Sequence, residues 1–95
     1  MKKKISLDAK LPVKLTVREC NIIRDETFCD PRLVRLAPVD GKHVLIEWSL
    51  DEIEDVQGFV AAEANHTENK QLETALDRIF IKLQVYLDSY DDQEE

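Results

Sequence analysis

Glycine and proline are scarce in this sequence, with only two glycines and three prolines among 95 residues. An all-β domain needs turn residues between its many short strands, so this composition argues against a turn-rich all-β fold. Cysteine is scarce too, and two cysteines without Cys-x-x-Cys spacing give no disulfide framework. We expect both thiols to be reduced, as thiols are in cytosolic proteins.

Long apolar runs are also missing. No window approaches the roughly 20 apolar residues of a membrane-spanning helix. Residues 2–4 are three lysines, but the mixed segment ISLDAK at residues 5–10 follows them in place of the apolar core of a secretory signal. The sequence therefore predicts a cytoplasmic protein that does not enter a membrane.

An excess of positive charge is the third absence. The net charge is −7, from 20 Asp and Glu against 13 Lys and Arg, and residues 88–95 hold five of the acids. The rest of the chain is nearly neutral, so it offers no basic surface to a phosphate backbone, and we expect no direct binding of nucleic acid. Residues 89–95 are predicted to form a flexible acidic tail.

The sequence does contain two clear alternations of apolar and polar residues. Residues 11–15 and 43–48 alternate with the period of two that is typical of half-buried strands. Residues 1–10 are predicted to be loosely ordered or to add an edge strand, because Ile5 and Leu7 alternate as well. The pattern leaves both a parallel and an antiparallel pairing of the strands open.

Two capping boxes predict where helices begin. Residues 16–19 (TVRE) and 49–52 (SLDE) each place a hydroxyl residue three positions before a Glu. The first helix is expected to stop at residues 29–31 (CDP), and the second to run over residues 50–65. Gly58 in that second helix costs roughly 1 kcal/mol relative to Ala, which predicts close packing by another element at that point.

The third helix has the strongest periodicity in the chain, after a polar turn at residues 65–69. Its broad apolar face comprises Leu72, Ala75, Leu76, Ile79, Phe80, Leu83, Tyr86, Leu87 and Tyr90. We expect it to pack antiparallel on the second helix. The predicted fold is α+β: a small two- or three-stranded sheet with three main helices, in a single domain over residues 11–88. The alternative is an all-α domain in which residues 43–48 are merely extended.

Glu63 and His66 are the one pair that suggests chemistry, because residues three apart share a helix face. Carboxylate-bridged di-iron sites take a Glu-x-x-His pair from each of two helices, but this chain has no second pair. The preferred interpretation is that His66 lies near a helix C-terminus and interacts with the helix dipole. Metal binding by Glu63 and His66 is the alternative, and no cofactor is predicted.

The cysteines and a cluster of acids also have structural interpretations. Cys20 falls on the apolar stripe of the first helix, where a free thiol behaves as a small hydrophobe. Nucleophilic catalysis by Cys29 would need His43 or His66 as its base. The acids within residues 51–55 do not match a calcium loop, and they complement the positive end of the helix dipole. The sequence therefore contains no complete catalytic constellation.

Three apolar residues fall outside the predicted apolar faces. Phe59 lies off the stripe of the second helix, and Ile81 and Val85 lie four apart on the polar back of the third. Isolated apolar residues are normal on protein surfaces, and the first helix could cover Phe59. The functional alternative is a small docking surface or a two-fold dimer interface.

A family resemblance can be added to this pattern. The segments LTVRE, RLAPVDGK and GFVAAEANHTENKQL, at residues 15–19, 35–42 and 58–72, resemble those of a small uncharacterised bacterial domain family. The resemblance covers nearly the whole chain from residue 11 onward. It implies a bacterial source, and it implies no catalytic or binding residue, since the family has no established activity.

The sequence thus favours a non-catalytic protein-interaction or regulatory module, with a protein partner or a second copy as its ligand. One alternative is a small metal-dependent or acid/base enzyme centred on Glu63 and His66. Another is an acidic partner of a basic protein, which would bind through residues 88–95. The sequence does not indicate a small-molecule ligand.

Overall fold

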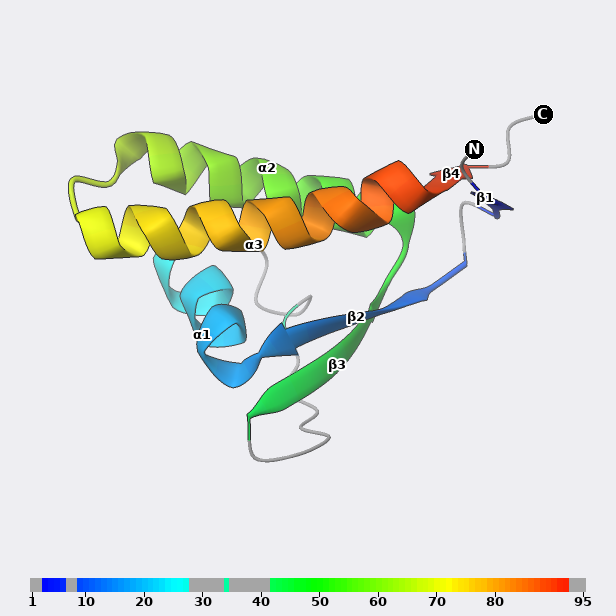
Figure 1. Cartoon of the computed structure of the whole chain (residues 1–95), viewed down its shortest axis with the longest axis horizontal. Coiled ribbons are helices and arrows are strands. Elements are labelled where there is room, and N and C mark those ends of the chain that lie inside the picture. The colour runs from blue at the N-terminus through cyan, green and yellow to red at the C-terminus, as the bar shows by residue number, and fades with distance from the viewer. Residues whose placement is uncertain (1–2, 7–8, 28–33, 35–41, 93–95) are drawn as a thin grey trace.

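The computed structural model describes residues 3–6, 9–27, 34 and 42–92. The elements in chain order are β1 (Lys3–Ile5), β2 (Leu11–Thr16), α1 (Val17–Glu26), β3 (His43–Trp48), α2 (Leu50–His66), α3 (Lys70–Ser89) and β4 (Tyr90–Asp92) (Figure 1). Within these residues there are three helices and two strand pairs. The α+β prediction is confirmed, and the formation of β3 rules out the all-α alternative.

β2 and β3 form an antiparallel pair in which Leu11 lies opposite Trp48 and Thr16 lies opposite His43. Buried and exposed side chains alternate along both strands, so one face of the pair belongs to the core. The inward-facing residues are Leu11, Val13, Leu15, Val44, Ile46 and Trp48. The alternation predicted from the sequence is therefore present, and the pairing direction, which the sequence left open, is antiparallel.

Both predicted capping boxes are present at the starts of α1 and α2. The Thr16 hydroxyl accepts from the Glu19 backbone N–H at 3.0 Å, and the Glu19 carboxylate accepts from the Thr16 N–H at 2.8 Å. At α2 the Ser49 hydroxyl accepts from the Glu52 N–H at 3.3 Å, and the Glu52 carboxylate accepts from the Ser49 N–H at 2.9 Å. Each box satisfies two backbone donors that have no partner inside the helix.

α2 and α3 lie side by side and run in opposite directions in Figure 1, as the sequence predicted. Asn69 begins α3, because its side-chain oxygen accepts from the backbone N–H groups of Gln71 and Leu72. The side chains that the two helices bury completely or almost completely are Leu50, Ile53, Val56, Val60, Leu76, Ile79 and Leu83. These belong to the apolar stripes of the second and third predicted helices.

The hairpin of α2 and α3 forms one layer. α1 and the β2–β3 pair together form a second layer, which packs against one side of the hairpin (Figure 1). The core fills the space between them, where Cys20 and Ile23 of α1 are fully buried and Trp48 of β3 is 1% exposed. Val34 is buried with them. The predicted helix stop at residues 29–31 lies outside the described residues, and α1 ends at Glu26.

The first and last strands that the structure describes pair with each other. β1 pairs with β4 in parallel, with Lys3 opposite Tyr90 and Ile5 opposite Asp92, and both strands lie beyond the same end of α3 (Figure 1). Ile5 and Tyr90 are partly buried against the core. The segment from residue 89 onward, predicted to be a flexible tail, thus starts with the last residue of α3 and continues into the paired strand β4.

The prediction of close packing at Gly58 is wrong for the part of the chain that the structure describes. Gly58 is exposed on α2, and a Cβ atom built on its backbone meets no heavy atom within 4 Å. The helix is packed by its stripe of larger residues, and Gly58 lies on the opposite side. None of the described helices is long and apolar enough to span a membrane.

Candidate functional site

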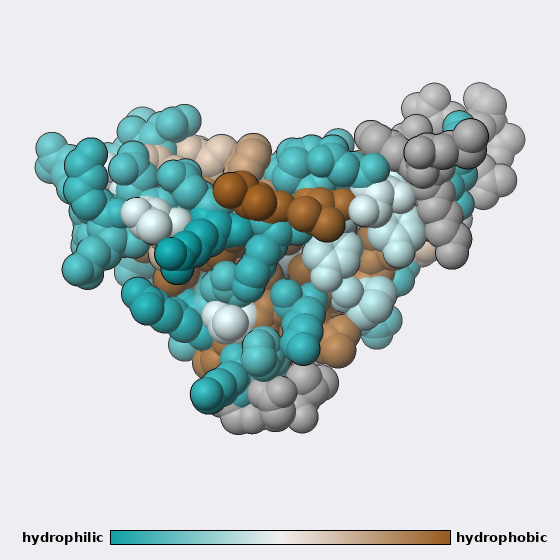
Figure 2. All heavy atoms as spheres, viewed as in Figure 1, coloured by the Kyte–Doolittle hydropathy of each residue, from teal (hydrophilic) through white to brown (hydrophobic). Residues whose placement is uncertain are grey.

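The outer face of α3 carries two exposed apolar side chains. Ile81 is 63% exposed and Val85 is 57% exposed, although Leu83 between them is fully buried. Residues four apart on a helix lie one turn from each other on the same face. Figure 2 shows an apolar band over α3 with hydrophilic side chains on both sides of it. This face therefore has an apolar centre and a polar border.

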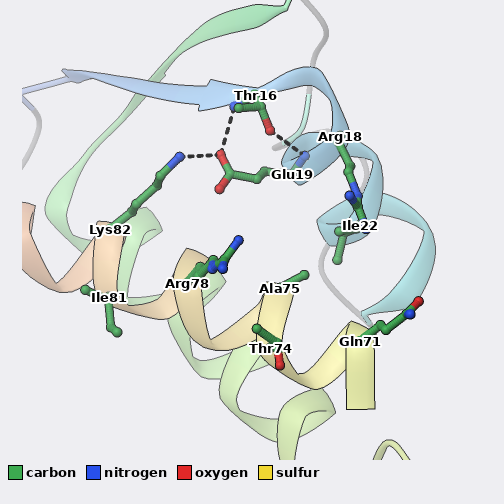
Figure 3. Close-up of a pocket in the computed structure, with 10 residues that line it drawn as sticks. All are labelled: Thr16, Arg18, Glu19, Ile22, Gln71, Thr74, Ala75, Arg78, Ile81 and Lys82. Atoms are coloured by element: carbon green, nitrogen blue, oxygen red, sulfur yellow. Dashed lines mark hydrogen bonds and ion pairs between the residues drawn. The ribbon is translucent and has the colours of Figure 1, made fainter. Parts of the chain in front are cut away.

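A groove of about 560 Å³ runs between α3 and α1, next to this apolar face (Figure 3). Its apolar lining consists of Ile22 of α1 and Ala75 and Ile81 of α3. Its charged lining residues are Arg18, Glu19, Arg78 and Lys82. The groove is therefore mostly basic, although the whole chain carries a net charge of −7.

Of the three cations in the groove, Lys82 alone has an anionic partner among the residues that the structure describes. The Lys82 ammonium lies 2.7 Å from the Glu19 carboxylate, and the same carboxylate oxygen accepts from the Thr16 N–H (Figure 3). Among the described residues, the guanidinium groups of Arg18 and Arg78 have no hydrogen bond and no ion pair. Figure 3 shows Arg78 pointing from α3 into the space between the two helices. Two guanidinium groups are thus available to an anion on this side of the molecule.

A second hollow of about 430 Å³ continues along α3 and shares Lys82 with the groove. It is lined by Lys14 of β2, His43 of β3 and the α3 residues Lys82, Val85 and Tyr86. The Tyr86 hydroxyl accepts from the Lys14 backbone N–H at 3.3 Å, which joins β2 to α3. Basic side chains therefore border the apolar face along most of its length.

Glu63 and His66 lie at the end of α2. His66 is the last helical residue and is exposed, whereas Glu63 is half-buried, and its backbone carbonyl accepts from the Thr67 N–H at 2.9 Å. In the described residues no group of three or more His, Cys, Asp and Glu is placed to hold a metal ion. The two side chains alone are too few to form a structural or catalytic metal site.

Cys20 is buried in the core. Burial raises the pKa of its thiol to about 11, with the Glu19 charge acting in the same direction and the Arg24 charge opposing both. A buried, protonated thiol is a poor nucleophile, so Cys20 packs as a small hydrophobe, as expected. Cys29 lies outside the described residues.

The acidic first turn of α2 is mostly exposed, and Glu52 is its one member with several partners. Burial acts to raise the pKa of Glu52, but hydrogen bonds from Lys10 and Ser49 and the Lys10 charge outweigh it and lower the pKa. Lys10 and Glu52 also form an ion pair. This turn thus closes a helix cap and ties the start of β2 to α2.

Phe59 is 37% exposed on α2 and contributes to neither hollow along α3.

The basic residues around Ile81 and Val85 were missed by sequence reasoning, because Arg18 and Lys14 are more than 60 residues from Lys82 in the chain. The available signal was local, since Arg78 and Lys82 are one turn apart and adjoin Ile81.

No family model, curated protein or solved structure matches the chain. The resemblance to a bacterial domain family therefore stays a prediction.

Proposed function

We propose that this chain is a non-catalytic protein-interaction or regulatory module that binds a protein through the outer face of α3. The observation that carries this proposal is the pair of exposed apolar side chains, Ile81 and Val85, one turn apart on a long helix. When a partner removes adjacent exposed apolar groups from water, the free energy of the system falls by roughly 25 cal/mol for each Å² of apolar surface buried.

The surroundings of the two residues support the same role. Protein interfaces combine an apolar centre with a polar rim, and arginine is enriched in them. Arg78 adjoins Ile81 on α3, and Lys82 separates the groove from the hollow that Val85 lines. The side chain of Glu19, the one acid that lines the groove, is engaged with Lys82 and the cap of α1. An apolar pair with basic side chains around it is therefore suited to binding the surface of another protein.

A site-specific photo-crosslinking residue at position 85 tests this proposal in living cells. We expect a covalent adduct to a protein from position 85, and no such adduct from position 55, an exposed polar position on α2. Adding Ile81→Asp should abolish the adduct, because a charge in the apolar centre opposes burial.

Position 81 serves as a second probe on the same face. If neither position 81 nor position 85 yields more adduct than position 55, the proposed function is wrong. Circular dichroism of each variant checks that the fold is unchanged, as expected for substitutions at exposed sites.

A further inference from the structure

We propose that the protein partner is a second copy of this chain, and that two α3 helices pack antiparallel about a two-fold axis near Leu83. In this arrangement Ile81 of each copy faces Val85 of the other, and Arg78 of each copy faces Asp88 of the other. The inference rests on the proposed function, because it names the partner of the same face.

The spacing along α3 supports the two-fold arrangement. Arg78, Ile81, Val85 and Asp88 are separated by steps of three, four and three residues, which is the heptad spacing of a helix pair. Along the helix these four side chains are a cation, two apolar groups and an anion, in that order. In an antiparallel two-fold pair, residues equally distant from position 83 lie opposite each other, so each group meets its complement. A parallel pair would place Arg78 against Arg78 and Asp88 against Asp88.

The charged ends of this stripe are available for such contacts. Arg78 and Asp88 are both exposed, and neither forms an ion pair with any of the described residues. One Asp88 carboxylate oxygen accepts from the Gln84 side chain at 2.9 Å, which holds the carboxylate on α3. Each copy therefore presents an unpaired cation and an unpaired anion on either side of its apolar pair.

Two effects limit the strength of this dimer. Only two apolar side chains per copy lie at its centre, and the net charge of −7 on each copy produces repulsion. At 0.15 M salt the Debye length is about 8 Å, so distant charges are screened more than the close Arg78–Asp88 contacts. We therefore expect a reversible dimer with a dissociation constant on the order of 10–100 μM.

Sedimentation velocity on the whole chain tests the inference, at concentrations from about 5 to about 500 μM, which bracket that constant. The wild-type sedimentation coefficient should rise with concentration from the monomer value toward the dimer value. Ile81→Asp/Val85→Asp should sediment as a monomer throughout. Arg78→Asp and Asp88→Arg should each weaken the dimer roughly tenfold, because each reversal creates two like-charge contacts per dimer.

The double variant Arg78→Asp/Asp88→Arg is the decisive measurement. It restores opposite charges at both contacts, so its dissociation constant should return to within about threefold of the wild-type value. Asp55→Arg on α2 is the matched control, because it changes the net charge by the same amount as Asp88→Arg from an exposed site away from α3. The control should dimerise at least as well as the wild type.

A wild type that stays monomeric at the highest concentration overturns the inference, and so does a double variant that is as weak as the single reversals. These outcomes differ from a failure of the proposed function. A monomer whose position 85 crosslinks to a different protein retains the interaction role and loses only the second copy. An adduct of twice the 11.0 kDa chain mass supports the inference.

Discussion

Cys20 shows how burial fixes the chemistry of one residue. Its thiol is fully buried, and its pKa is raised from 9.0 to about 11, mainly by burial. The folded state therefore keeps the proton at a pH where the unfolded chain loses it. Keeping the thiol protonated stabilises the folded state relative to the unfolded chain. This contribution is fully present below pH 9 and is lost as the pH rises through about 11.

We predict that this titration weakens the fold at high pH. Two pKa units correspond to roughly 2–3 kcal/mol in the free energy of unfolding. Urea denaturation of the wild type at pH 7, 9 and 11 should show this loss, and Cys20→Ala should lack that part of the pH dependence although its stability is lower at pH 7. Equal pH profiles for the two proteins would contradict the assignment.

At the scale of single elements, local sequence patterns were informative. The boxes at Thr16 and Ser49 predicted the starts of α1 and α2, because a cap depends only on residues within one turn. The apolar stripe of α3 predicted its buried side chains for the same reason. Gly58 was misread, because a helix-breaking residue in the middle of a helix has no local explanation, and its surroundings depend on the neighbouring elements.

Gly58→Ala is predicted to stabilise the protein by roughly 0.5–1 kcal/mol. The position is exposed and helical, and a Cβ atom there meets no heavy atom within 4 Å, so the lower entropy of the unfolded chain is not offset by strain. Ala62→Gly, at another exposed position of α2, is the matched reverse change and should destabilise by a similar amount. Urea denaturation midpoints measure both. A destabilised Gly58→Ala would show that something packs on this glycine.

At the scale of the whole molecule, the strand near the start of the chain pairs with the strand near its end. β1 pairs with β4 across almost the full length of the chain, and Ile5 packs on the core from that pair. Tyr90–Asp92, the residues that follow α3, are therefore held beyond the end of the helix by pairing with the start of the chain.

Ile5→Ala tests the docking of both ends. Removing a half-buried Ile side chain should lower stability by about 1–2 kcal/mol, less than the cost at a fully buried site. Lys4→Ala, at the exposed neighbouring position, should change stability by less than about 0.5 kcal/mol. Thermal unfolding measured by circular dichroism compares the two. Equal midpoints would mean that β1 contributes nothing to the fold.

The sequence by itself determined β2, α1, β3, α2 and α3 and the face that each of them buries, whereas β4 was not predicted. Alternation, helical periodicity and capping involve residues a few positions apart, so the residues near Thr16, Ser49 and Leu83 are read without knowledge of the rest of the chain. The exposure of Ile81 and Val85 was predicted for the same reason.

Only the tertiary structure decided how these elements meet. The antiparallel pairing of β2 with β3, the pairing of β1 with β4 and the groove between α1 and α3 join residues that are 27 to 87 positions apart. Such contacts depend on how the whole core packs, because many loop closures have similar entropic cost and local patterns do not choose among them. For this reason Arg18 and Arg78, which border the proposed interface together, were found in the structure and not in the sequence.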